Sequence, residues 1–342
     1  MKNKNYNNLS FKIIIILISI IFIASLTANI YFLFNFEKLS GSPTSEFSLL
    51  NPLLRLLKYD SAEDRRANTI VSFNFLRQNI EDLLGEQKKQ TGIYIEDLNT
   101  GTWMGINEKQ KFVPASLIKV AFAMAALKKV DKGIWTMDTN LLLQPKYKNK
   151  KYGELYKLAD FSDIPLHLVI EEMIISSDNT AVSMIYNSLT KEEKDDVFYH
   201  IGQRNPDENP EFPHVVEFYS PKELANAYRV LYNSSFLTRK NSQYLLELLS
   251  KTKFRQEIPR GLPSGVNIAH KIGEATMASN QKLEQVSFHD CGIVYYPQRP
   301  YMICVMTEGI AIKDASNFIA SISEKAYNYI SEYDLIFGQK TK

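Results

Sequence analysis

The chain has 342 residues, of which 45% are hydrophobic and 23% are charged, and its formal net charge is +2. This composition excludes a chain that is disordered or of low complexity over most of its length. Residues 1–36 carry three lysines and no acid, so the remainder has 37 basic against 38 acidic side chains. Because this body has no basic excess, we expect no nucleic-acid partner.

The N-terminus carries a membrane signal. Residues 13–34 contain no charge, and about 20 apolar residues are enough to cross a bilayer as a helix. Lysines precede this stretch and Glu37 follows it, which predicts a cytoplasmic tip and transmembrane signal anchor over residues 1–36. We therefore expect a single-pass plasma-membrane protein with an extracytoplasmic body. The alternative is a cleaved signal peptide and a secreted protein, although a cut after Ala28 would leave Leu26 where a small residue is preferred.

Residues 37–68 are predicted to form an extracytoplasmic tether. Ser-Pro-Thr-Ser at positions 42–45 is typical of a linker, whereas residues 49–57 hold too many leucines for a solvated one. These leucines either dock on the body of the protein or lie at the membrane surface, and the sequence leaves both readings open.

Residues 69–342 have the element order of one α/β (α+β) domain. Apolar residues at helical spacing predict an opening helix, and two short apolar runs around Asn99-Thr100-Gly101 predict a hairpin. The further predictions are a helical section, three strands and a closing helix, over residues 114–249, 266–271, 285–296, 301–307 and 318–330. Ser220, Pro221 and Glu223 form a capping box inside the helical section. The predicted fold is an antiparallel sheet flanked by N- and C-terminal helices, with an all-helical subdomain between its halves.

Ser116 and Lys119 form a Ser-x-x-Lys motif at the predicted start of an alanine-rich helix. Residues three apart share a helix face, so the amine of Lys119 can approach the hydroxyl of Ser116. A serine beside a desolvated lysine is an activated nucleophile, and a helix N-terminus favours a developing anion. The ordinary alternative is a capped helix with a surface lysine.

Ser177-Asp178-Asn179 lies at a break between two predicted helices. All three residue types favour helix caps, which is the ordinary interpretation of the tripeptide. In the functional interpretation, Ser177 relays a proton to a leaving group and the amide of Asn179 binds substrate.

Lys271-Ile272-Gly273 ends a predicted strand. If this lysine lies beside Ser116, its charge disfavours the ammonium form of Lys119 and lowers the pKa of that base. The same charge would attract a substrate carboxylate. Each motif alone is weak evidence for an active site. The three motifs in this order, on a helix, a loop and a late strand, are a specific combination.

The three motifs together resemble the penicillin-interacting signature of class A β-lactamases and penicillin-binding proteins. The chain also looks like class A β-lactamases in the segments 92–98, 114–120, 177–181 and 292–297. The resemblance covers residues 69–342 and implies a serine β-lactamase-like fold, with the site between the sheet and the helical subdomain.

By matching positions, the resemblance implies a role for each motif residue. Ser116 would be the acylated nucleophile, Lys119 its base and Ser177 the proton relay. Substrate would be bound by Asn179, Lys271, Gly273 and Glu274, with the backbone amides of Ser116 and Glu274 forming the oxyanion hole.

Two departures from the family pattern concern the substrate and deacylation. Ile272 stands where the family usually has Thr or Ser, whose hydroxyl helps to hold a carboxylate. Residues 200–220 contain three glutamates, and none has the Asn four residues later that marks the family's water-activating acid: Glu208, Glu211 and Glu217. We expect these acids to be exposed loop charges. Without such a base, an acyl-enzyme formed with a β-lactam would persist.

Cys291 and Cys304 are predicted to lie on adjacent strands and on the same face of the sheet. A two-residue turn would place them one pair out of direct register, so we expect two buried free thiols rather than a disulfide. The five histidines show no metal-ligand spacing, and no metal or other cofactor is expected. His270 is interpreted as a strand residue that shapes the wall of the site.

The leading hypothesis is a membrane-anchored extracytoplasmic serine hydrolase that resembles class A β-lactamases and opens β-lactam amides through an acyl-enzyme. One alternative is a D-alanyl-D-alanine peptidase-like penicillin-binding protein that deacylates β-lactams slowly. Another is a catalytically idle wall-binding module that keeps the fold. The expected partner is a small-molecule β-lactam or a peptidoglycan stem peptide, and the oligomeric state is left open.

Overall fold

The computed structural model describes Ser25 and residues 48–51, 71–203, 218–277, 285–297 and 299–338. Among these residues there is no helix with the length and apolar character that a membrane span requires. The predicted anchor lies outside the described residues except for Ser25, as do the three loop glutamates Glu208, Glu211 and Glu217. The architecture below is that of the unit Leu49–Lys342.

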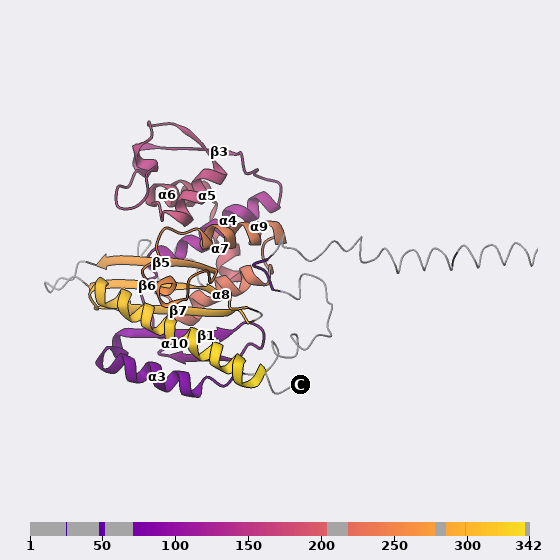
Figure 1. Ribbon diagram of the computed structural model, residues 1–342. Coiled ribbons are helices and arrows are strands. Elements are labelled where there is room, and N and C mark those ends of the chain that lie inside the picture. The colour runs from indigo at the N-terminus through magenta and orange to yellow at the C-terminus, as the bar shows by residue number, and fades with distance from the viewer. Residues whose placement is uncertain are drawn as a thin grey trace, which may run out of the picture. The chain divides into compact units, whose positions relative to one another are not determined.

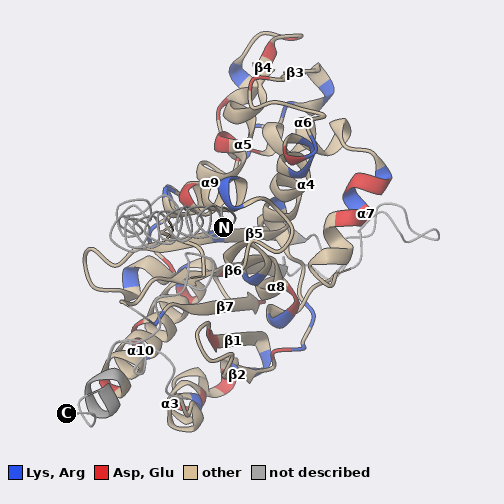
Figure 2. Ribbon diagram, turned by 90° about the vertical axis from the view of Figure 1, so that its right-hand side faces the viewer, with Lys and Arg blue, Asp and Glu red and all other residues tan. Residues whose placement is uncertain are grey.

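Five antiparallel strands form the main sheet in the order β2-β1-β7-β6-β5, and Figure 2 shows them one below another. The strands are β1 (Thr91–Asp97), β2 (Trp103–Ile106), β5 (Ile268–Met277), β6 (Gln285–Val294) and β7 (Tyr301–Glu308). The β1–β2 pairing confirms the predicted hairpin, in which Gly101 adopts the positive φ that its turn needs. Because β1 pairs with β7, the sheet joins both ends of the domain, as predicted.

Helices α3 (Asn74–Leu84) and α10 (Ile312–Gly338) cover one face of this sheet (Figure 1). Their apolar residues, such as Ile80 and Ile319, are fully buried with strand residues such as Ile95 and Val305. Each such side chain contributes about 1.5–3 kcal/mol by leaving water. The closing helix begins at Ile312, earlier than the sequence pattern indicated.

The section between β2 and β5 is mainly helical, as predicted, and packs toward the other side of the sheet. Its helices are α4 (Lys119–Asp131), α5 (Leu166–Ile175), α6 (Asn179–Ser188), α7 (Lys191–His200), α8 (Pro221–Tyr232) and α9 (Arg239–Ser250). Its short 3-10 turns are η3 (Ala115–Ile118), η4 (Pro145–Tyr147) and η5 (Leu155–Lys157), while η2 (Gly85–Gln90) and η7 (Ile258–Gly261) flank the section. The expectation of an all-helical subdomain needs one correction, because β3 (Asn140–Leu142) and β4 (Asp163–Pro165) form a two-stranded sheet within it.

The capping box at the start of α8 is confirmed in both directions. The Ser220 hydroxyl accepts from the backbone N–H of Glu223, and the Glu223 carboxylate accepts from the backbone N–H of Ser220. This reciprocal cap satisfies two backbone donors at the helix start.

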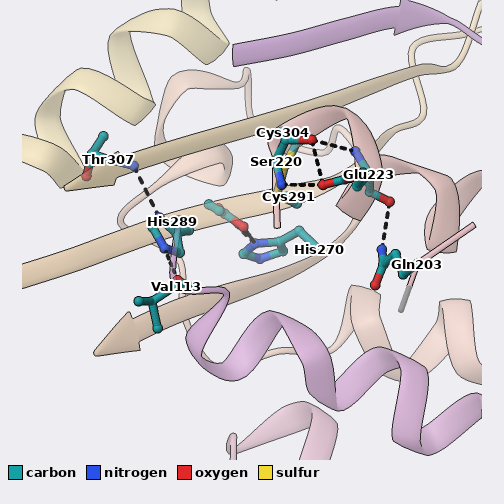
Figure 3. Close-up of a disulfide and its surroundings, with 10 residues drawn as sticks. Val113, Gln203, Ser220, Glu223, His270, His289, Cys291, Cys304 and Thr307 are labelled. Carbon is teal, nitrogen blue, oxygen red and sulfur yellow. Dashed lines mark hydrogen bonds and ion pairs between the residues drawn. A yellow bond between two sulfur atoms is a disulfide. The ribbon is translucent and has the colours of Figure 1, made fainter. Parts of the chain in front are cut away.

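The prediction of two free cysteines is wrong, because Cys291 and Cys304 form a disulfide (Figure 3). The connection between β6 and β7 spans residues 295–300 rather than two residues. This longer turn brings Cys291 directly opposite Cys304 in the ladder. Directly opposed residues lie on the same face of a sheet and close together, which is the placement that a cross-strand disulfide needs.

The first leucines after the predicted linker dock on the domain. Leu50 is fully buried, and the backbone N–H of Leu49 donates to Gln243 on α9 at 3.0 Å. Asn51 continues this attachment by donating its backbone N–H to the carbonyl of Tyr232 on α8. Docking on the body is therefore found for these residues, whereas the remaining leucines of the stretch lie outside the described residues.

Candidate active site

Ser116 lies in the 3-10 turn η3, immediately before α4, rather than inside the α-helix itself. The preceding residue, Ala115, has a φ of +50°, a left-handed conformation that costs energy for any residue with a Cβ. The serine is half-buried, while α4 behind it is almost entirely buried. The turn therefore presents the hydroxyl at the start of a rigid helix.

His289 on β6 holds the segment that leads to Ser116. Its Nε2 donates to the carbonyl of Val113 at 2.7 Å, and its Nδ1 accepts from the backbone N–H of Thr307 at 3.1 Å (Figure 3). Burial lowers the pKa of His289 to about 4, so the ring is neutral near pH 7 and one nitrogen stays an acceptor. This histidine is a positioning residue that sequence reasoning missed, because nothing in the sequence links it to Val113.

Gly273 explains why the third motif ends in glycine. A Cβ at this position would lie 2.8 Å from the carbonyl oxygen of Pro114 and 3.1 Å from the side chain of Leu117. Only a residue without a side chain lets β5 approach the Ser116 turn so closely. The structure thus brings the first and third motifs together, as the hypothesis required.

Lys119 is buried and makes three hydrogen bonds through its amine. The amine donates to the carbonyl of Ser177 at 2.7 Å, to the Ser177 hydroxyl at 3.2 Å and to the Asn179 side-chain oxygen at 2.6 Å. Among the described residues, no side-chain hydrogen bond joins it to Ser116. The first and second motifs therefore meet at the lysine amine.

Burial lowers the pKa of the Lys119 amine to about 7, and the charge of Lys151 adds to the shift while Asp178 opposes it. Desolvation is thus the main cause, whereas we expected the charge of Lys271 to lower this pKa. The two amines do interact, because the charge of Lys119 lowers the pKa of Lys271. A lysine with this pKa is about half neutral at pH 7 and can then accept a proton, whereas an ordinary surface lysine is almost fully charged.

Asp178 performs the capping role that the tripeptide also suggested. Its side chain accepts from the backbone N–H of Ala181 at the start of α6 and from that of Leu155 at 2.9 Å. Ser177 beside it has a φ of +56°, so the chain turns sharply there. Because Asp178 caps the helix, the side chains of Ser177 and Asn179 can instead accept hydrogen bonds from Lys119.

Lys271 on β5 is fully buried. Burial lowers its pKa well below the ordinary value, and the nearby charge of Lys119 lowers it further, while Asp290 opposes the shift. Its amine lies 5.5 Å from the centre of the Phe254 ring and donates to the carbonyl of Ile272 at 3.3 Å. The third-motif lysine is thus electrostatically coupled to the base of the first motif.

His270 lies on β5 as predicted, but its contacts are structural. Its Nδ1 lies 2.8 Å from Asp290, whose other carboxylate oxygen accepts from the backbone N–H of Ile258. The ring is fully buried. The interpretation of His270 as a wall of the site stays a prediction.

Glu274, one residue beyond Gly273, is the acid of this site. Its carboxylate accepts from the Tyr152 hydroxyl at 2.5 Å and lies 3.5 Å from the amine of Lys151. The carbonyl of Tyr152 accepts from the backbone N–H of Asn179 at 3.3 Å. Tyr152 was not foreseen, because its segment carries no motif. In the part of the chain that the structure describes, no group of His, Cys, Asp and Glu side chains could hold a metal ion.

Comparisons with known proteins find relatives in both sequence and structure. Extended-spectrum beta-lactamase PER-1 of Pseudomonas aeruginosa is 20% identical over 275 residues, which are 74% of this chain and 87% of that protein. The solved structure of PBP-A is 27% identical, with a TM-score of 0.67 and coverage of 76% of this chain and 97% of its own. The extended-spectrum beta-lactamase TLA-1 is 18% identical, with a TM-score of 0.67 and coverage of 76% and 99%, and shows the fold alone.

A PBP-A variant solved as an acyl-enzyme complex with penicillin G is 26% identical, with a TM-score of 0.66 and coverage of 75% of this chain and 97% of its own. Residues 75–330, which include all three motifs and every strand of the sheet, match the beta-lactamase enzyme family. The resemblance and the expected antiparallel sheet flanked by helices are thus confirmed, and the chain belongs to the beta-lactamase enzyme family.

Proposed function

We propose that this chain is a serine hydrolase that opens amides, β-lactams among them, through an acyl-enzyme on Ser116. The observation that carries the proposal is the buried amine of Lys119, whose pKa is lowered to about 7 and which contacts the Ser177 hydroxyl. A general base with a pKa near the working pH is what proton abstraction from a serine requires.

In the proposed reaction the amine of Lys119 takes the proton of the Ser116 hydroxyl as the serine oxygen attacks the amide carbonyl. The Ser177 hydroxyl, hydrogen-bonded to the same amine, passes a proton to the leaving nitrogen. The backbone N–H groups of Ser116 and Glu274 stabilise the oxyanion. The side chains of Asn179 and Lys271 hold the substrate.

The experiment is covalent labelling with a fluorescent penicillin, followed over time. Wild-type protein should carry one label, and Ser116→Ala should carry none. Ser183→Ala is the matched control and should label normally, because it removes another hydroxyl of α6, one that donates to the backbone carbonyl of Asn179 one turn earlier. Absence of labelling in the wild type would favour the idle wall-binding module.

Slow deacylation is the second candidate behaviour. It is favoured by residues 200–220, where no glutamate is followed by Asn four residues later, and by the similarity to PBP-A. Hydrolysis of nitrocefin distinguishes fast from slow deacylation. Sustained turnover supports a β-lactamase. A stoichiometric burst supports a penicillin-binding, D-alanyl-D-alanine peptidase-like enzyme that acts on stem peptides.

We also propose that the domain is held outside the plasma membrane by residues 1–36. The support is the uncharged stretch at 13–34 behind three lysines. Fractionation tests this placement: the full chain should sediment with membranes and be open to added protease in spheroplasts, and a chain lacking residues 1–36 should not sediment with membranes.

A further inference from the structure

Glu274 and Tyr152 form a bridge between the edge strand and the segment opposite it. Their hydrogen bond of 2.5 Å joins residues 122 positions apart in the sequence. Lys151 adds an ion pair to the same carboxylate at 3.5 Å. No step of the proposed reaction uses the side chain of Glu274, so this bridge calls for a separate explanation.

Each end of the bridge between Glu274 and Tyr152 lies next to a residue of the candidate active site. At one end, Gly273 packs on the carbonyl of Pro114 in the turn that presents Ser116. At the other end, Tyr152 accepts from the backbone of Asn179, whose side chain contacts the amine of Lys119. A substrate held by both β5 and Asn179 would lie beside this bridge, and its entry would displace the Tyr152 hydroxyl from Glu274.

Displacing the tyrosine leaves a carboxylate that needs a new donor. The Glu274 side chain is only 19% exposed, so water replaces the lost hydrogen bond poorly. Lys151 compensates little, because its side chain is 48% exposed and such ion pairs are weak. A substrate that brings an N–H group or a positive charge restores the interaction, whereas a substrate carboxylate faces a like charge.

One further feature of the same strand acts in the same direction. Ile272 lies two residues before Glu274, on the same side of the strand, and offers no donor to a carboxylate.

We propose that Glu274 is a specificity-determining residue that favours acyl donors with a neutral or cationic group beside the scissile bond over donors with a free carboxylate there. This inference rests on the proposed acyl-serine function. It predicts internal or amidated peptide bonds, rather than free C-terminal carboxylates, as the preferred substrate class.

The test uses three thioesters of phenylacetylglycine that differ only in the thiol: thiocholine is cationic, 2-mercaptoethanol is neutral and 3-mercaptopropionate is anionic. Ser116 attacks the carbonyl carbon and forms an ester as the C–S bond breaks. The serine proton passes through Lys119 and Ser177 to the leaving thiol. Water then hydrolyses the ester to phenylacetylglycine and free serine. Thiol release is followed with a chromogenic disulfide, and mass spectrometry detects the adduct on Ser116.

In the wild type, kcat/KM for the thiocholine ester should exceed that for the mercaptopropionate ester by at least about tenfold, because the Glu274 carboxylate attracts the trimethylammonium group and repels the mercaptopropionate carboxylate. Glu274→Gln should reduce this ratio toward one. Tyr152→Phe removes only the displaced hydroxyl, so it should raise kcat/KM for all three esters and keep the ratio. Glu154→Gln, which neutralises an exposed acid two residues from Tyr152, is the matched control and should change nothing.

Equal rates for the three esters, or a ratio that Glu274→Gln leaves intact, would overturn the selectivity while leaving the acyl-serine function standing. Wild-type protein that releases no thiol and gains no adduct would instead overturn both. Thermal unfolding of each variant shows whether it folds, and Tyr152→Phe tests the bridge independently of the charge at residue 274.

Discussion

The amine of Lys119 lies 3.2 Å from the hydroxyl of Ser177, although 58 positions separate these residues in the sequence. The contact joins the start of α4 to the turn before α6, and both residues are buried. The amine of Lys119 is therefore hydrogen-bonded directly to the residue that we propose as the proton relay.

Replacing Lys119 by arginine should slow acylation strongly, because it replaces the base by a permanently charged group of similar length. Arginine stays protonated at every working pH, so it cannot accept the serine proton. Removing a general base slows reactions by about 10²–10⁴-fold. The measurement is the rate of labelling by fluorescent penicillin. Lys132→Arg, at an exposed lysine just after α4, is the control and should label at the wild-type rate. Wild-type labelling by Lys119→Arg would remove this lysine from the role of base.

The acylation rate should rise with pH and level off above about pH 7. Only the neutral amine of Lys119 accepts a proton, and its pKa is lowered to about 7. Below that pH, the rate should fall about tenfold per unit as the amine becomes charged. Stopped-flow acylation between pH 5 and 9 measures the profile.

Lys151→Met provides the internal check on this profile. The charge of Lys151 helps to lower the pKa of Lys119, so its removal should move the midpoint to higher pH. A rate that decreases between pH 6 and 8 would contradict the assignment of Lys119 as the base.

The motif residues could be predicted because their signals are local. Ser116 and Lys119 are three positions apart, and such spacing brings residues to one side of a helical turn whatever the rest of the chain does. The strand Lys271-Ile272-Gly273 and the cap at Asp178 likewise follow from neighbouring residues. The order of the elements then predicted a sheet built from both ends of the domain.

The contacts that complete the site are long-range and left no trace in the sequence. His289 bonds Val113 across 176 positions, and Tyr152 bonds Glu274 across 122. The disulfide was missed for a related reason, because the register of β6 and β7 depends on the shape of the turn at residues 295–300. A one-residue change in that turn decides whether two cysteines face each other.

Removing the disulfide should destabilise the domain by about 3 kcal/mol, the value expected for closing a loop of about this length. The double variant Cys291→Ala/Cys304→Ala should therefore unfold at a lower urea concentration than the wild type. Adding a reductant should lower the stability of the wild type and leave the double variant unchanged. If a reductant has no effect on wild-type unfolding, the pair does not stabilise the fold. Cys291 lies directly opposite Lys271 in the sheet, so the labelling rate of the double variant also reports on the site.

Gly273→Ala should lower the rate of penicillin labelling more than it lowers the stability of the fold. The added Cβ would meet the carbonyl of Pro114 at 2.8 Å, and this backbone cannot retreat freely because His289 holds the neighbouring carbonyl of Val113. The Ser116 turn must then shift, and a misplacement of about 1 Å costs about 10²-fold in rate.

Gly265→Ala is the control for this substitution. Gly265 has a φ of +87° but open space around its Cα, so an alanine there is strained without touching the Ser116 turn. It should lower stability by about 1–2 kcal/mol and leave penicillin labelling at the wild-type rate. The comparison is made on labelling rates well below both unfolding temperatures. Equal labelling rates for Gly273→Ala and Gly265→Ala would show that the close approach of β5 to Pro114 does not position the nucleophile.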